Sequence, residues 1–291
     1  MDFLQSHFLW LDIVIAATMS AAAAAAVGVH AILRRVVFLP AALSQLAGVG
    51  VVASFLVAHN LDGDWHGSIL EAPKIFAIVF AAVGAIVLGL MREARGTTRE
   101  WGLGGVYIAS SALIVLIGGH IPQEIHDVND ILFGNAIAIE REQMATTAIV
   151  SSAVLLIHAA LARPFVATAF DQQTASAHRV PVRSLDVLLF VSMGLAAATS
   201  TRVVGALPAF AFAVFPGACA LRLARDARAV VAIAAGLGVL DAFLGYWASF
   251  VLSLPTGACM AAMALAVFIV VRAVLRAQRL LGWLFPRRTS P

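Results

Sequence analysis

The stretch Leu11–Leu33, LDIVIAATMSAAAAAAVGVHAIL, decides the fold class of this chain. Its only charged residue is Asp12, and a helix needs about 20 apolar residues to cross the hydrocarbon core of a membrane. Pro73–Met91 and Ala229–Leu252 have the same apolar character. Each of these stretches therefore predicts a membrane-spanning α-helix.

The composition of the whole chain agrees with this interpretation. Hydrophobic residues make up 62% of the 291 positions and charged residues 12%, and the mean hydropathy is +0.95. A soluble domain has about 25% charged residues. We predict an all-α membrane protein, a single domain over residues 1–291 that forms a polytopic bundle of eight or nine transmembrane helices. The nine candidate spans are 8–32, 36–58, 73–91, 101–119, 144–163, 185–203, 205–222, 229–252 and 256–276. The seventh, which is rich in proline and glycine, is expected to be broken or re-entrant.

The basic residues predict the orientation of these spans. If the N-terminus is periplasmic and the C-terminus cytoplasmic, all but three of the 19 lysines and arginines lie on the cytoplasmic side. The three exceptions are Lys74, Arg141 and Arg202. We therefore predict a multi-pass protein of the bacterial inner membrane, surrounded by lipid. Because the basic residues gather on the cytoplasmic side, they explain the high pI, and we predict no nucleic-acid partner.

Small residues within the spans are interpreted as packing positions. Ala21–Ala26 lies inside the first span, and runs of small residues let helices approach closely. Cys219 and Cys259 also lie in apolar stretches, so we predict neither a disulfide nor a metal pair.

The two outer loops gather carboxylates and imidazoles, which attract and bind divalent cations. The candidate metal residues of this periplasmic mouth are His59, Asp62, Asp64, His66, His120, Glu124, His126 and Asp127. The alternative is that these residues belong to ordinary solvated loops.

Four stretches resemble the permease subunits of bacterial zinc, manganese and iron ABC importers, the ABC-3 family. The shortest is Leu132–Gly134, which resembles the family's Leu-Phe-Gly turn after the fourth span. Residues 28–50, GVHAILRRVVFLPAALSQLAGVG, resemble the family's Leu-Arg-Arg turn and the Gly-Asp-Ala-Leu-Ser-His stretch that follows it. Residues 170–186, FDQQTASAHRVPVRSLD, resemble its short cytoplasmic helix. Residues 202–218, RVVGALPAFAFAVFPGA, resemble a later span.

The resemblance implies that residues 170–180 form a coupling helix, which docks on a cytoplasmic ATPase subunit. The residues assigned to this role are Phe170, Asp171, Gln172, Thr174, Ala175, His178 and Pro181. Asp171 is also placed to cap the helix, because its side chain can accept bonds from the first free amides. This sequence departs from the family by lacking a glycine near His178 or Arg179. The alternative is an ordinary polar connection between helices.

The chain lacks the means to hydrolyse ATP. A Walker motif needs a lysine after its glycine-rich loop, and the only lysine, Lys74, has no such loop before it. We therefore predict no enzyme activity and no prosthetic group. The predicted partners are a dimer of an ABC ATPase subunit, which supplies ATP hydrolysis, a periplasmic metal-binding protein, and a second copy of this permease.

The family's metal ligands are replaced in this sequence. The Asp and His of Gly-Asp-Ala-Leu-Ser-His, which the resemblance identifies as intramembrane ligands, correspond to Ala41 and Gln45, and Ser44 and Gln45 are the polar remnants. His30 is a possible substitute, although a histidine at a helix end is more often structural. Asp241 is another, because a carboxylate within a span is usually functional or paired.

The leading hypothesis is an importer permease for a divalent transition metal, zinc first on account of the histidines, then manganese or iron. The alternatives are a permease of the same fold for another solute, such as a metal chelate, and a membrane scaffold that transports nothing. An intramembrane protease is disfavoured, because the sequence contains no His-Glu-x-x-His motif.

Overall fold

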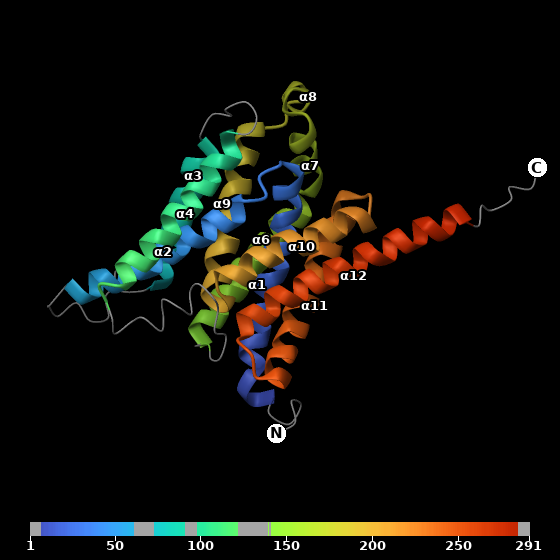
Figure 1. The fold of residues 1–291 in the computed structure, drawn as a ribbon. Helices are drawn as coiled ribbons and strands as arrows, with labels where there is room; N and C mark the ends of the chain where they lie inside the picture. Colours follow the sequence, from blue (N-terminus) through green and yellow to red (C-terminus); the bar gives the residue numbers. More distant parts are fainter. Residues whose placement is uncertain (1–6, 61–72, 91–97, 122–138, 140, 285–291) are drawn as a thin grey trace, which may run out of the picture.

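The computed structural model describes residues 7–60, 73–90, 98–121, 139 and 141–284. In these residues the regular secondary structure is entirely α-helical (Figure 1). The helices are α1 (His7–Leu33), α2 (Leu39–Asn60), α3 (Pro73–Leu90), α4 (Thr98–Gly118), α6 (Arg141–Ala160), α7 (Ala162–Phe170), α8 (Gln172–Ala177), α9 (Val182–Val204), α10 (Ala206–Leu223), α11 (Ala227–Leu252) and α12 (Thr256–Leu284).

Eight of these helices are long and apolar enough to cross a membrane, namely α1, α2, α4, α6, α9, α10, α11 and α12. The remaining predicted span, 73–91, corresponds to α3, whose apolar part, Ile75–Gly89, is shorter. The prediction of an all-helical chain with eight or nine spans is thus confirmed for the described residues. Which side of the membrane each terminus faces remains a prediction.

Helix α1 is the centre of the bundle and packs against α6, α9, α10 and α11. The predicted packing role of Ala21–Ala26 is confirmed, because all six side chains are buried. At Gly28 the backbones approach so closely that a Cβ atom would lie 1.6 Å from the carbonyl oxygen of Ala213 in α10. Small residues permit this contact, and close backbone packing is the main attraction between helices in lipid.

The prediction that the seventh span is broken or re-entrant is wrong, because α10 is one continuous helix from Ala206 to Leu223. Its Pro208 lies in the first turn, where no intrahelical donor is lost, and a proline such as Pro216 is tolerated in membrane helices packed on neighbours. Gly217 serves close packing, since a Cβ there would lie 3.0 Å from the backbone nitrogen of Val29. The break comes earlier, at Gly205 between α9 and α10, where φ is 91°.

Helices α7 and α8 lie at the end of the bundle opposite the N-terminus (Figure 1). Helix α7 follows α6 after one residue, Leu161, and Asp171 then separates it from α8. A separate α7 was not predicted from the sequence. The two cysteines are free, as predicted, with Cys219 buried.

Candidate functional site

A cavity of about 270 Å³ lies between α2, α4 and α10. Its lining combines neutral polar and apolar side chains from all three helices: Ala41, Gln45, Tyr107, Ser111, Ala206, Leu207 and Phe210. The cavity thus includes both positions at which the family resemblance places metal ligands. Here these positions present a methyl group and an amide.

Gln45 is the lining residue of this cavity that has an unpaired polar atom. Its side chain is only 5% exposed, and its Oε1 atom has no hydrogen-bond partner. Leaving a buried acceptor unpaired costs about 1–3 kcal/mol, so a rearrangement that brings a donor to this oxygen would be favourable. Ser111 lines the same cavity and donates its hydroxyl proton to the Tyr107 carbonyl oxygen at 2.9 Å. Ser44 is also buried with an unpartnered Oγ, but it does not line the cavity.

Three aromatic rings adjoin the cavity. Phe38, just before α2, contacts Tyr107 edge-on with ring centroids 6.4 Å apart, and it contacts Phe210 at 5.9 Å. Tyr107 and Phe210 themselves line the cavity. These contacts join α2, α4 and α10 through apolar surface.

The predicted periplasmic mouth falls mostly on positions whose structure is not described. Asp62, Asp64, His66, Glu124, His126 and Asp127 lie outside the described residues. His59 belongs to the last turn of α2, and His120 is exposed beyond the end of α4, with its Nδ1 atom 2.8 Å from the Leu116 carbonyl oxygen. Among the described residues, no three His, Cys, Asp or Glu side chains come close enough to hold a metal ion.

The two other candidate pathway residues, His30 and Asp241, lie away from the cavity. His30 is fully buried in α1, and its Nδ1 atom lies 3.0 Å from Nδ1 of His158 in α6. Asp241 is buried in α11, and its Oδ1 atom has no hydrogen-bond partner. Neither side chain is among those that line the cavity.

A short helix, α8, lies where the sequence predicted one, and Asp171 caps it as expected. The Asp171 carboxylate accepts hydrogen bonds from the backbone amides of Gln173 and Thr174 at 2.9 and 3.0 Å, and from the Thr174 hydroxyl. The Thr174 hydroxyl, followed by the two amides, lowers the pKa of Asp171. Phe170 beside it is 77% exposed, whereas Ala175 packs inward.

The end of α8 explains the glycine expected near this position. The Val180 amide donates to the Ala175 carbonyl and the Arg179 amide to the Ser176 carbonyl, at 3.1 and 2.9 Å. These two bonds define a Schellman motif, whose left-handed residue is usually glycine. In this chain that residue is Arg179, with φ 59°.

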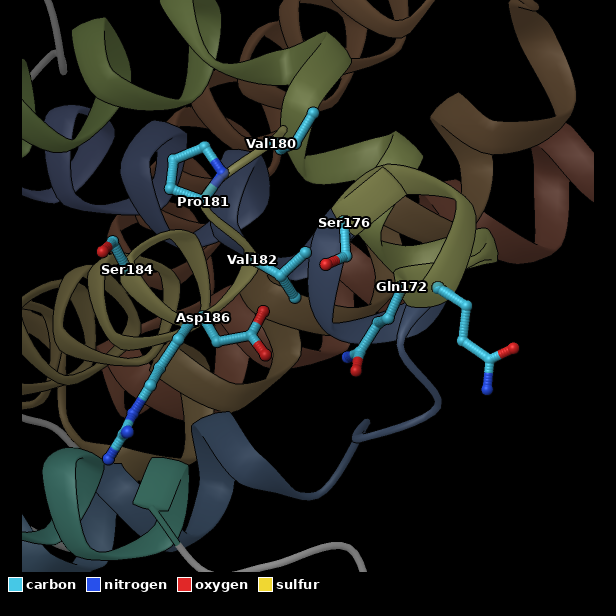
Figure 2. Close-up of a pocket in the computed structure, with 9 residues that line it drawn as sticks. Gln172, Ser176, Val180, Pro181, Val182, Ser184 and Asp186 are labelled. Carbon is cyan, nitrogen blue, oxygen red and sulfur yellow. The ribbon is translucent and has the colours of Figure 1, made fainter. Parts of the chain in front are cut away.

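A polar groove of about 910 Å³ adjoins α8 (Figure 2). Gln172 and Ser176 from α8 lie on one side, and Asp186 from α9 lies on the other. The remaining lining residues are Gln173, Val180, Pro181, Val182, Arg183 and Ser184. His178 is exposed at the end of α8 and does not line the groove.

Arg34, just after α1, bonds to both α7 and α9 at this end of the bundle. Its Nη1 atom forms an ion pair with Asp186 at 2.5 Å, and its Nη2 atom donates to the Thr168 hydroxyl of α7 at 2.6 Å. The sequence predicted neither contact, because Arg34 and Thr168 are far apart in the chain.

The sequence profile of the ABC 3 transport family matches residues 6–275. The manganese import system permease protein ScaB of Streptococcus parasanguinis is 29% identical over 256 residues, which are 88% of this chain and 86% of that protein. The manganese transport system membrane protein MntC of Halalkalibacterium halodurans is 27% identical, over 83% of this chain and 79% of that protein.

Two solved structures share the fold. PsaBC from Streptococcus pneumoniae, in complex with a Fab, contains a chain that superposes with a TM-score of 0.78 at 25% identity and covers 92% of both chains. An inward-facing putative metal-chelate type ABC transporter superposes with a TM-score of 0.73 at 15% identity, over 94% of this chain and 89% of that one.

Proposed function

This chain belongs to the ABC 3 transport family and is the multi-pass permease subunit of a bacterial ABC metal importer, and we propose that it carries a hydrated divalent ion, manganese before zinc or iron. As such a permease, it works with an ATPase and a binding protein and is itself no enzyme. The cavity between α2, α4 and α10 is the proposed resting place of the ion.

The observation that carries this proposal is the unpartnered Oε1 atom of Gln45, a residue that lines an uncharged cavity together with Tyr107 and Ser111. Six waters of about 30 Å³ each occupy about 180 Å³, which is less than the cavity of about 270 Å³. The amide oxygen and the hydroxyls of Tyr107 and Ser111 can accept hydrogen bonds from metal-bound water. Such a site holds the ion weakly enough to release it.

The ligand chemistry supports manganese over zinc. Carbonyl, carboxylate and water oxygens suit Mn²⁺, whereas zinc prefers imidazole and thiolate in closed tetrahedral sites. The relatives named as manganese transporters support the same order. The histidines that favoured zinc in the sequence-based prediction belong to the outer loops, most of whose structure is not described.

Uptake by the assembled transporter tests this proposal. The permease, its cognate ATPase and its binding protein are reconstituted in liposomes, and ATP-driven entry of Mn²⁺, Zn²⁺ and Fe²⁺ is measured separately. We expect Mn²⁺ to enter fastest. Zn²⁺ uptake without Mn²⁺ uptake would overturn the preference, and no uptake of any ion would overturn metal transport by this permease.

The double variant Ala41→Asp, Gln45→His tests the water-mediated binding. It introduces the ligand pair that the family resemblance expects, so we predict tighter Zn²⁺ binding and slower release. Gln45→Leu removes the amide oxygen at similar volume and should lower Mn²⁺ uptake about tenfold, the effect of about 1.4 kcal/mol. Unchanged uptake by Gln45→Leu would exclude this cavity as the site.

We further propose that two copies of the permease face two ATPase subunits, with α8 as the coupling helix. The residues that support the coupling role are Phe170, Asp171, Gln172, Thr174, Ala175, His178 and Pro181. Their segment is polar, capped and bordered by a groove, and the aromatic ring of Phe170 is exposed. ATP binding would move α8 and rock the spans between outward- and inward-open states.

A metal chelate is the second candidate cargo. The rings of Tyr107 and Phe210 in the cavity can contact an organic ligand, and no charged group lines it. Uptake of a labelled chelate that free Mn²⁺ does not inhibit would favour this candidate.

A further inference from the structure

Three buried polar side chains connect the helices beneath α7. His30 in α1, His158 in α6 and Ser192 in α9 are each at most 2% exposed. Nδ1 of His158 lies 3.0 Å from Nδ1 of His30, and Nε2 of His158 lies 2.9 Å from Oγ of Ser192. We name this set the His-His-Ser chain.

One arrangement of protons satisfies every bond of the His-His-Ser chain. Ser192 donates its hydroxyl proton to the Leu189 carbonyl at 2.8 Å, so its oxygen accepts from Nε2–H of His158. A neutral His158 then accepts at Nδ1 from Nδ1–H of His30, which also points at the Ala26 carbonyl 3.3 Å away. The unpartnered Nε2 of His30 is left as an acceptor without a proton. The hydrogen bonds of the His-His-Ser chain are therefore all donated in one direction, from α1 towards α9, and both imidazoles are neutral.

The inner face of α7 rests directly on this chain. Phe165 is fully buried, and its ring centroid lies 5.1 Å from that of His30 and 5.2 Å from that of His158. One turn later, Thr168 accepts a hydrogen bond from Arg34, which also pairs with Asp186 of α9. A displacement of α7 therefore acts on α1, α6 and α9 together.

Interhelical hydrogen bonds add directional contacts to the van der Waals packing that holds helices together in lipid. Apart from the unpaired Nε2 of His30, each ring nitrogen of this buried network has a partner, and such directional bonds favour one arrangement of the groups they join. Since α8 follows α7 after Asp171 alone, this network begins one short helix away from the ATPase contact.

We propose that the His-His-Ser chain is a positioning element that makes α1, α6 and α9 move as one body when the ATPase displaces α8. This inference rests on the proposed coupling role of α8. Weakening the chain should therefore separate ATP hydrolysis from movement of the spans, while the transporter still assembles.

The test compares His158→Gln, which keeps a donor and an acceptor, with His158→Phe, which keeps a ring but no hydrogen bond. Both are made in the full permease, assembled with its ATPase and binding protein in liposomes. We expect His158→Phe to lower Mn²⁺ uptake per ATP hydrolysed about tenfold, within the usual range of coupling energies. His158→Gln should recover most of that loss.

A matched serine pair gives a second comparison. Ser192→Ala and Ser54→Ala each remove a buried hydroxyl that bonds a carbonyl three residues earlier in its own helix. Ser192 also bonds another helix through His158. Ser192→Ala should lower uptake per ATP, and Ser54→Ala should leave it unchanged.

A readout without cargo separates failure of this inference from failure of the proposed function. A cysteine at Ser111, in a protein with Cys219 and Cys259 replaced by alanine, reports ATP-dependent opening of the cavity through its labelling rate. We expect ATP to change this rate in the parent protein and in His158→Gln, but much less in His158→Phe. Equal responses in all three, or equal losses in Ser192→Ala and Ser54→Ala, would overturn the proposal whichever solute is carried.

Discussion

Arg179 occupies a backbone conformation that most helices assign to glycine. Its φ of 59° belongs to the Schellman motif that ends α8. Arg35 does the same at the end of α1, with φ 57° and a Val36 amide bonded to the Ala31 carbonyl at 2.9 Å. An L residue in this region costs about 1–2 kcal/mol. The charge offsets part of that cost, because a cation is favoured at a helix C-terminus.

We therefore expect Arg179→Gly to be more stable than Arg179→Ala by about 1 kcal/mol, since both lose the charge and only glycine relieves the backbone. Thermal unfolding of the two purified variants in one detergent measures the difference. An equal midpoint would contradict the left-handed conformation at this residue.

Asp171 should make the stability of α8 depend on pH. The hydrogen bond from Thr174 and those from the two amides lower the pKa of Asp171. A carboxyl group whose pKa is lowered in the folded state stabilises that state at pH values above its ordinary pKa. This stabilisation is lost as the pH falls through the lowered pKa. At neutral pH the cap is complete.

We expect Asp171→Ala to weaken association with the ATPase at every pH, because the cap is lost. Asp171→Asn keeps an oxygen acceptor, so it should retain association with the ATPase, and this association should depend less on pH. Co-purification of the ATPase with each variant across acidic pH checks this, and equal behaviour of the two variants would exclude capping as the cause.

At the scale of single elements, α1 shows how small residues decide packing. Gly28 lies against the Ala213 backbone, while a Cβ atom at Gly236 of α11 would meet no atom within 4 Å. Both glycines lie inside helices, where alanine is intrinsically the better helix former. Their difference is therefore one of tertiary contact.

Gly28→Ala should lower the melting temperature and the yield of folded protein, because backbone atoms cannot yield as a flexible side chain can. Gly236→Ala should be neutral or slightly stabilising, by at most about 1 kcal/mol. Fluorescence-detected size exclusion after heating compares the two. Equal losses would show that α1 and α10 are not in close contact.

Helix α7 ends in an exposed aromatic ring, two residues before α8 begins. Phe170 is 77% exposed and lies outside the candidate spans. A single exposed apolar residue is common on protein surfaces, but aromatic residues are enriched among those that dominate interfaces.

We predict that Phe170→Ala weakens ATPase binding by at least about 1 kcal/mol and leaves folding unchanged. Titration of the ATPase onto the detergent-solubilised permease measures the affinity. Gln173→Ala, which removes a neighbouring exposed polar side chain, is the control. Loss of affinity in the control alone would contradict the anchoring role of Phe170.

At the scale of the whole molecule, the orientation in the membrane decides which end meets the ATPase. The positive-inside pattern predicts that α8 faces the cytoplasm and that the α11–α12 turn at Ser253 faces the periplasm. Both Ser176 and Ser253 are exposed.

Cysteines at these two positions, in a protein without Cys219 and Cys259, test that orientation. An impermeant maleimide should label Ser253→Cys on intact spheroplasts and label Ser176→Cys only after permeabilisation. The reverse pattern would invert the topology and separate α8 from a cytoplasmic ATPase.

Much of this fold is predictable from local sequence. Long apolar runs fix the positions of the spans within a few residues, because a bilayer accepts only segments whose backbone polar groups are bonded internally. Ala21–Ala26 indicated close packing, and Asp171 indicated a helix start, since both are properties of neighbouring residues. Pro216 and Gly217 misled the prediction for α10, because neighbouring helices decide whether such residues break a helix.

The cavity around Gln45 shows which features the sequence determines and which depend on tertiary structure. The sequence alone determined a polytopic helical membrane protein, its resemblance to metal permeases, and the loss of two expected ligands at Ala41 and Gln45. Only the tertiary structure brought Tyr107 and Ser111 to that position and paired His30 with His158. These partners come from different helices, and their meeting depends on how the spans pack, which no local pattern in the chain encodes.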